Sequence, residues 1–148
     1  MAGESKPRCE FESDKLLVRL SVVIAADVSA ISPVVERVMG IVGEMGCAKD
    51  HEFAVELALR EALANAVIHG AKKDPKKKVE FCVACDAERG MLIVVRDPGE
   101  GFDPTSLPSP VVGQQVYEEH GRGIYLINQL MDEVRFERGG TEIHMRKY

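Results

Sequence analysis

Apolar and polar residues alternate in five segments of the chain, the pattern of β-strands with one buried face. These segments are residues 15–26, 79–86, 91–97, 133–137 and 141–148. Turns containing glycine separate the second segment from the third and the fourth from the fifth, which predicts two antiparallel hairpins.

Three other stretches have apolar residues at helical spacing. In the first, Ser32 and Pro33 predict a helix that begins there, as an N-cap followed by a first-turn proline, and ends by Gly46. The second begins near Asp50, is apolar almost all the way round and ends at Gly70, so we expect a buried helix. A third helix follows the glycine turn at residues 121–123.

Hairpins with helices between them predict an α+β fold. We expect a two-layer sandwich in which a mixed, largely antiparallel sheet carries helices on one face. Residues 1–14 are polar and predict a loose tail, and residues 15–148 predict a single domain. Residues 103–120 are rich in proline and polar side chains, so we expect a lid there rather than a plain turn.

Composition narrows the classes of function. The 148-residue chain has a net charge of -5, which argues against a general nucleic-acid binder. No apolar run is long enough to span a membrane, and the N-terminus does not have the pattern of a signal peptide. We therefore expect a cytoplasmic protein with no direct contact to nucleic acid or membrane.

Four cysteines are present, two of them in a C-x-x-C at Cys82 and Cys85. This pair lies in a strand pattern, where residues three apart point to opposite faces, and no second pair of metal ligands follows it. We therefore expect reduced, structural cysteines rather than a metal or redox centre. The lysine-rich loop 71–78 has two interpretations, a solvated loop, which is the commoner case, or a positive rim that attracts an anionic ligand or partner.

The first candidates for a functional site are Glu61 and Asn65, which lie four residues apart on the second helix among apolar neighbours. Buried polar groups need partners, so protein groups or a ligand must satisfy them. Three further features follow in order along the chain: Asp97-x-Gly99-x-Gly101, Gly121-x-Gly123, and Thr141. Each is weak alone, but the ordered set on the expected elements is a strong signal.

This set resembles the GHKL ATPase superfamily. The segment E-A-L-A-N-A-V-I-H-G, the short chain and M-D-E-V near its end are most similar to the anti-sigma-factor serine kinases of that superfamily. The resemblance covers nearly all of the chain after residue 15. It implies the Bergerat fold, with ATP and Mg²⁺ held between helices and sheet beneath a mobile lid.

Chemistry agrees with the roles that the resemblance implies. Asn65 offers a hard, neutral oxygen suited to Mg²⁺, and Glu61 can accept a proton from an attacking hydroxyl. Asp97 can accept from the exocyclic amine of adenine, where guanine presents a carbonyl. Gly99 and Gly101 permit a close approach of the backbone to base and ribose.

The remaining implied contacts lie further along the chain. Gly121, Arg122, Gly123 and Ile124 open a helix whose free N–H groups can bind phosphates. Some of these kinases carry an arginine just before this motif, where the present chain has Glu118, Glu119 and His120. Arg122 either supplies that charge to the γ-phosphate or is a surface residue. Thr141 resembles the threonine that supports adenine.

Two functions are compatible with this constellation. In the first, the protein is a serine/threonine kinase that phosphorylates a small antagonist protein and regulates transcription by partner switching. In that family a sigma factor is also sequestered, and homodimers are frequent. In the second, it is a nucleotide-gated binding module without significant kinase activity. Glu61 favours the kinase, because binding alone needs no base at that position.

Overall fold

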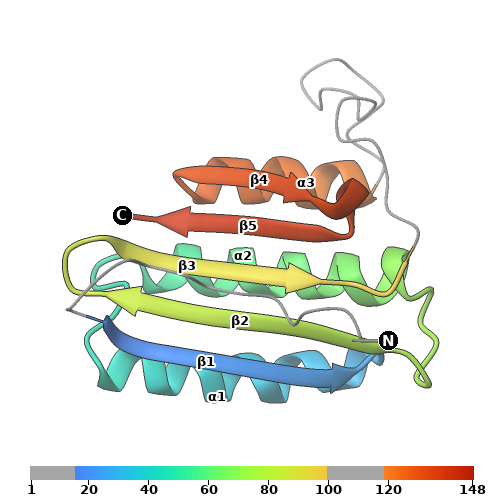
Figure 1. Cartoon of the computed structure of the whole chain (residues 1–148), viewed down its shortest axis with the longest axis horizontal. Helices are drawn as coiled ribbons and strands as arrows, with labels where there is room; N and C mark the ends of the chain where they lie inside the picture. Colours follow the sequence, from blue (N-terminus) through green and yellow to red (C-terminus); the bar gives the residue numbers. More distant parts are fainter. Residues whose placement is uncertain (1–15, 100–118) are drawn as a thin grey trace, which may run out of the picture.

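The alternating segments form five strands of one antiparallel sheet (Figure 1). The computed structural model describes residues 16–99 and 119–148. The strands are β1 (Leu16–Ala25), β2 (Lys78–Asp86), β3 (Gly90–Arg96), β4 (Glu133–Glu137) and β5 (Glu142–Lys147). Their order is β1-β2-β3-β5-β4, and every neighbouring pair is antiparallel. We expected a mixed, largely antiparallel sheet, but within the described residues the sheet is wholly antiparallel.

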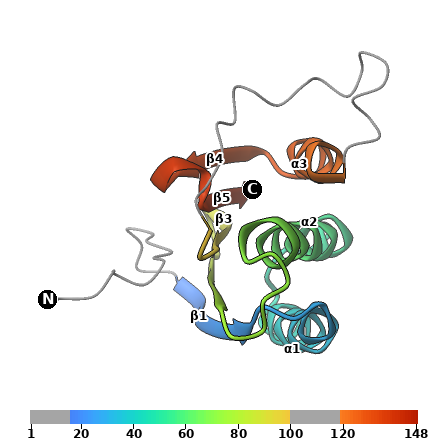
Figure 2. The same ribbon diagram turned by 90° about the vertical axis from the view of Figure 1, so that its right-hand side faces the viewer.

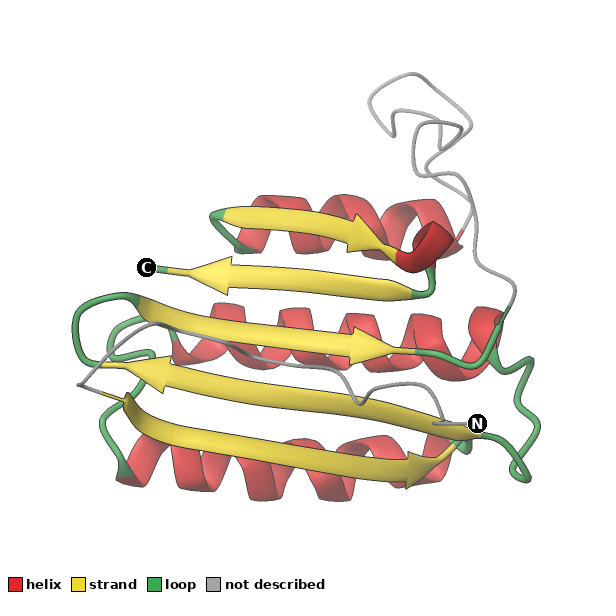
Figure 3. Cartoon of the chain, in the orientation of Figure 1, coloured by secondary structure: helices red, strands yellow, loops and turns green. Residues whose placement is uncertain are grey.

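Three helices cover one face of this sheet (Figures 2 and 3). They are α1 (Ile31–Glu44), α2 (Glu52–Asn65) and α3 (Glu119–Leu130). Short helical turns η1 (Val28–Ala30), η2 (Ala66–Gly70) and η5 (Arg138–Gly140) complete the description. The predicted two-layer α+β architecture is therefore confirmed. Among the described residues, no helix combines the length and the apolar character needed to cross a membrane.

The core lies between the helices and the sheet. Helix α2 is its centre, and the side chains that it buries are Val55, Ala58, Leu59, Ala62 and Leu63. The inward-facing positions of the strands meet them, as the period of two requires. A separate small cluster of Cys82, Ala84 and Val94 is buried on the other face of the sheet.

The start of α1 differs from the prediction that Ser32 is its N-cap. Helix α1 already begins at Ile31 and has no side-chain cap. Instead, Asp27 caps the preceding turn η1, because its Oδ1 accepts from the backbone N–H of Ser29 at 2.8 Å. The Ser32 hydroxyl lies inside the helix and accepts from Arg60 at 2.9 Å. Asp27 lies five residues before Ser32, and both side chains can cap a helix, so the sequence pattern alone did not distinguish the two positions.

The buried helix ends in an unusual turn. After Asn65 the chain continues as the π-helical turn η2, in which the N–H of Ala71 donates to the carbonyl of Ala66 at 2.8 Å. Such turns contain one residue more than an α-helical turn and are frequent at functional sites. Gly70 is the last residue of the turn, which confirms the predicted end of the helix.

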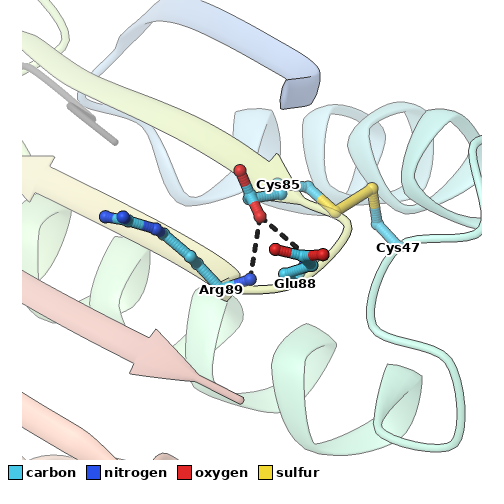
Figure 4. Close-up of a disulfide and its surroundings, with 5 residues drawn as sticks. Cys47, Cys85, Glu88 and Arg89 are labelled. Carbon is cyan, nitrogen blue, oxygen red and sulfur yellow. Dashed lines mark hydrogen bonds between the residues drawn. A yellow bond between two sulfur atoms is a disulfide. The ribbon is translucent and has the colours of Figure 1, made fainter. Parts of the chain in front are cut away.

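The prediction of reduced cysteines is wrong for two of them. Cys47, just after α1, forms a disulfide with Cys85 near the end of β2, and their Cα atoms are 6.1 Å apart (Figure 4). Cys82 is a free, buried thiol. Cys82 and Cys85 do face opposite sides of the sheet, as expected, since they belong to different buried clusters. The partner of Cys85 is 38 residues away in sequence, so no local spacing could reveal the pair.

Candidate functional site

A pocket opens where helices α2 and α3 meet the ends of strands β3 and β5. It has a volume of about 300 Å³, including space open to solvent. It contains four residues that the sequence assigned to the site, namely Asn65, Asp97, Ile124 and Thr141. Apolar and small residues form the rest of its wall: Ala62, Ala66, Val95, Phe136, Gly140 and Ile143. A flat, largely apolar group with a few polar atoms, such as a nucleobase, suits this lining.

Glu61 and Asn65 converge at the beginning of α3. Both are half-buried on α2, one turn apart. A Cβ atom placed on Gly123 would lie 3.1 Å from Glu61 Oε2 and 3.3 Å from Asn65 Oδ1. The Asn65 amide nitrogen would be 3.2 Å away, so only a glycine lets the beginning of α3 approach the two polar side chains this closely.

Asp97 follows the last residue of β3 and lines the pocket. Its Oδ1 accepts from the backbone N–H of Gly99 at 2.7 Å. Burial raises the pKa of the Asp97 carboxyl above its ordinary value, and the bond from Gly99 opposes that shift without cancelling it. A donor supplied by a ligand would therefore stabilise the ionised form of a carboxylate that the protein alone leaves partly desolvated.

Two glycines let the Asp97 turn approach the end of the α2–η2 helix. A Cβ on Gly70 would overlap the Asp97 side chain, whose Oδ1 would be only 2.6 Å away. A Cβ on Gly99 would in turn lie 2.5 Å from the carbonyl oxygen of Gly70. The two turns thus fit together only because neither position carries a side chain.

Thr141 is held next to Asp97 by the backbone. The N–H of Asp97 donates to the Thr141 carbonyl at 2.8 Å, which extends the pairing of β3 and β5 by one residue. The Thr141 hydroxyl donates to the carbonyl of Arg138 at 2.9 Å, so its orientation is defined. The hydroxyl oxygen retains lone pairs that can accept from a ligand or a water molecule.

The second glycine motif lies inside α3, not in a turn before it. The helix begins at Glu119, so Gly121 and Gly123 occupy its first two turns. Ile124 is buried and lines the pocket, whereas Arg122 is exposed.

Some of the residues assigned to the site from the sequence lie in parts of the chain that the structure does not describe. Gly101 and the expected lid up to residue 118 lie outside the described residues, as do the side chains of Glu119 and His120.

Sequence reasoning missed several members of the site. Gly70 was assigned only to the end of a helix, yet it is the contact surface for Asp97. Gly140 was assigned to a hairpin turn, yet it lines the pocket. A signal for Gly70 existed, because it follows the polar pair on the same helix at a fixed distance. The apolar wall carried no such signal, since its residues have the same pattern as ordinary core positions.

The sequence that forms this site is similar to those of known proteins. Residues 24–147 match the family described as the histidine kinase-like ATPase domain. The serine-protein kinase RsbW of Bacillus subtilis (strain 168) is 33% identical over 118 residues, in a match that covers 74% of this chain and 72% of that protein. The serine-protein kinase RsbW of Bacillus licheniformis is 34% identical over 119 residues, with the same two coverages of 74% and 72%. That of Staphylococcus epidermidis is 32% identical over 117 residues, with coverages of 74% and 73%.

Proposed function

This chain belongs to the family of histidine kinase-like ATPase domains, and we propose that it is an ATP-dependent serine/threonine protein kinase of the anti-sigma-factor type. The observation that carries the proposal is the convergence of Glu61 and Asn65 on Gly123, in the neighbourhood of a pocket that also contains Asp97. The similar proteins named serine-protein kinase support the same reaction class.

Adenine would occupy the apolar part of the pocket. The Asp97 carboxylate would accept from the exocyclic amine, while the Thr141 hydroxyl would contact the base directly or through water. An ionised acceptor makes a strong hydrogen bond, and a guanine carbonyl at the same place would be repelled. The pocket is therefore expected to select ATP over GTP.

The phosphates would extend from the base toward the beginning of α3. The first turn of a helix presents backbone N–H groups without partners in the helix and the positive end of its dipole, a suitable site for anions. Gly121 and Gly123 would allow the phosphates to approach this backbone closely. Arg122 is exposed beside them, and we assign it to the γ-phosphate as part of this proposal.

The residues beside this helix terminus fit a magnesium ion bound together with the phosphates. Within the described ranges, no three or more His, Cys, Asp and Glu side chains form a metal-binding group, so phosphate oxygens would have to complete the coordination. The Asn65 amide lies next to Gly123 at the beginning of α3, and its oxygen is the kind of ligand Mg²⁺ accepts. Bound there, the ion would neutralise charge on the transferring phosphate.

Glu61 would act as the general base. The hydroxyl oxygen of a serine or threonine on the partner forms a bond to the γ-phosphorus, while the bond from that phosphorus to the oxygen of the leaving ADP breaks. The hydroxyl proton passes to the Glu61 carboxylate. Phosphoryl transfer depends mainly on positioning and charge stabilisation, so one base and an anion site are sufficient machinery.

The substrate would be a small antagonist protein that carries the phosphorylated hydroxyl, in a cycle that also sequesters a sigma factor and so regulates transcription. We further expect the kinase to act in the cytoplasm as a homodimer. A pull-down from the host with ATP or ADP, followed by phosphosite mapping, identifies the partner.

The decisive test is single-turnover transfer of labelled γ-phosphate to the captured partner. Glu61→Gln should slow transfer by roughly 10²–10⁴-fold, the usual effect of removing a general base, while leaving ATP affinity nearly unchanged. Glu56→Gln is the matched control, because Glu56 lies on the same helix, partly exposed and paired with Arg60 at 3.3 Å. If the wild type binds ATP yet transfers nothing to any partner, the protein is a nucleotide-gated binding module instead.

A further inference from the structure

We propose that Arg96, Glu142 and His144 are positioning residues for the nucleotide site, acting through the sheet on Asp97 and Thr141. The inference rests on the proposed function only in that it assumes a nucleotide in the pocket. None of the three side chains lines that pocket. They belong to the opposite face of the sheet.

The three side chains form a buried, charged cluster on the face that carries no helix. Arg96 on β3 is directly opposite Glu142 on β5. The Glu142 Oε2 atom accepts from Arg96 Nε at 2.7 Å and is 2.6 Å from Arg96 Nη2. The other oxygen, Oε1, is 2.8 Å from His144 Nε2. The side chains of Arg96, Glu142 and His144 are only 9%, 8% and 15% exposed, so this is not a solvated surface pair.

Each member of the ion pair is the chain neighbour of a pocket residue. Arg96 precedes Asp97, and Glu142 follows Thr141. Successive residues of a strand point to opposite faces, so the ion pair lies behind the two residues that face the pocket. The backbone bond from Asp97 to Thr141 at 2.8 Å is the next step of the same ladder. A shift of Arg96 relative to Glu142 would therefore move Asp97 relative to Thr141.

Stability alone does not explain a cluster of this kind. Well-packed apolar residues often replace a buried ion pair without loss of stability. The directional bonds of this pair instead link one residue of β3 to one residue of β5 at a defined distance. Burial by itself would raise the pKa of Glu142, but the bonds from His144 and Arg96 outweigh it and hold that pKa below its ordinary value. The carboxylate thus stays ionised, with both oxygens engaged. Here, at the last residues of β3, the ladder has few further bonds to maintain the spacing.

The experiment measures nucleotide binding by calorimetry, at a temperature where each variant is folded. Glu142→Gln should raise the Kd for ATP about tenfold, and His144→Ala, which leaves the ion pair in place, about twofold. Both should lower the ratio of ATP to GTP affinity, because Asp97 is the group displaced. Arg96→Lys retains the charge and should give a smaller rise than Arg96→Gln. Arg60→Gln is the control, since it breaks a partly exposed ion pair with Glu56 on α2, away from this face of the sheet.

The outcomes separate this inference from its alternatives. A merely structural cluster would lower the fraction of active protein and its melting temperature, with an unchanged Kd for the molecules that remain folded. An unchanged Kd and an unchanged ATP-to-GTP ratio in Glu142→Gln would overturn the inference. If that variant fails to fold, His144→Ala decides in the same way. Failure of the wild type to bind ATP would instead refute the proposed function, so the two failures are distinguishable.

Discussion

Substitution of Gly70 by alanine should damage the nucleotide site from behind. Gly70 does not line the pocket, but its Cα faces the Asp97 side chain across the junction of η2 with the turn after β3. A methyl group at this position cannot be accommodated unless Asp97 moves. Because the obstacle includes the Cβ of Asp97 rather than only the end of a flexible chain, the backbone turn must move as well.

The structure sets the size of the effect. The new Cβ would lie 2.5 Å from Asp97 Cβ and nearer still to its Cγ, and ordinary contacts begin at 3.4 Å, so Asp97 must retreat by at least about 0.9 Å. Such a shift takes a hydrogen bond of normal length beyond its useful range. A bond to a charged group contributes about 1.5–3 kcal/mol, so ATP affinity should fall roughly 10- to 150-fold. The overlap should also destabilise the fold by about 1–3 kcal/mol.

Calorimetric titration with ATP and GTP measures this change, and thermal unfolding reports the cost to the fold. Gly40→Ala is the matched control, because a Cβ at Gly40 in α1 has no neighbouring atom within 4 Å. That variant should bind ATP normally and be slightly more stable, since alanine favours a helix over glycine. Gly70→Ala should also add little to Asp97→Asn, because both changes remove the same interaction.

Wild-type affinity and wild-type discrimination against GTP in a folded Gly70→Ala protein would refute the reasoning. It would mean either that Asp97 does not bind the base or that the turn tolerates the methyl group without moving it. Asp97→Asn distinguishes the two, since only the first explanation predicts that this variant also binds normally.

Other predictions concern the same framework. Asp97→Asn should weaken ATP binding by at most about 3 kcal/mol and reduce the preference over GTP, as titrations would reveal. Because burial raises the pKa of Asp97, its ionisation costs stability as pH rises from the ordinary value of 3.8 through the raised pKa. At neutral pH the melting temperature of Asp97→Asn should therefore be no lower than that of the wild type. Below the ordinary pKa of 3.8, any higher melting temperature of the variant should disappear, because the wild-type carboxyl is then protonated in both the folded and the unfolded state. Asn65→Ala should weaken both binding of ATP with Mg²⁺ and transfer, unlike Glu61→Gln. Reduction of the disulfide, or Cys47→Ser, should lower the melting temperature by roughly 10 °C, because the bond closes a loop between residues 38 apart. Loss of the disulfide should not change ATP affinity. Cys82 is not part of the disulfide, so the melting temperature of Cys82→Ala should still fall when reductant is added.

The sequence allowed the elements of the site to be predicted because each has a local pattern. Helix α2 carries its polar pair four residues apart, so one face of one helix places both. Asp97 continues the inward alternation of β3, which places it on the helix side of the sheet. Such inferences need only the period of an element and the position of a residue within it.

Features that depend on two distant segments were not predictable in this way. The disulfide joins residues 38 apart, and the contact of Gly70 with Asp97 joins a helix end to a strand end. Alternation along β5 places Glu142 and His144 on the outward face of the sheet, where polar side chains are usually solvated. Both are instead poorly exposed, because Glu142 bonds to His144 and to Arg96 on the adjacent strand. Alternation predicts which face a residue occupies, but only the register of strands predicts what lies beside it.

The π-helical turn at residues 66–70 makes chain length, rather than residue type alone, a determinant of this site. Four residues separate Asn65 from Gly70, one more than an ordinary turn would need for the same end point. Deletion of one of them would let an α-helical turn reach the same end point, so that Gly70 could still face Asp97. Insertion of a further residue would instead rotate the following residues by about 100° about the axis, and a side chain would then face Asp97 where Gly70 does now. This stretch is therefore expected to tolerate the loss of one residue but not the gain of one.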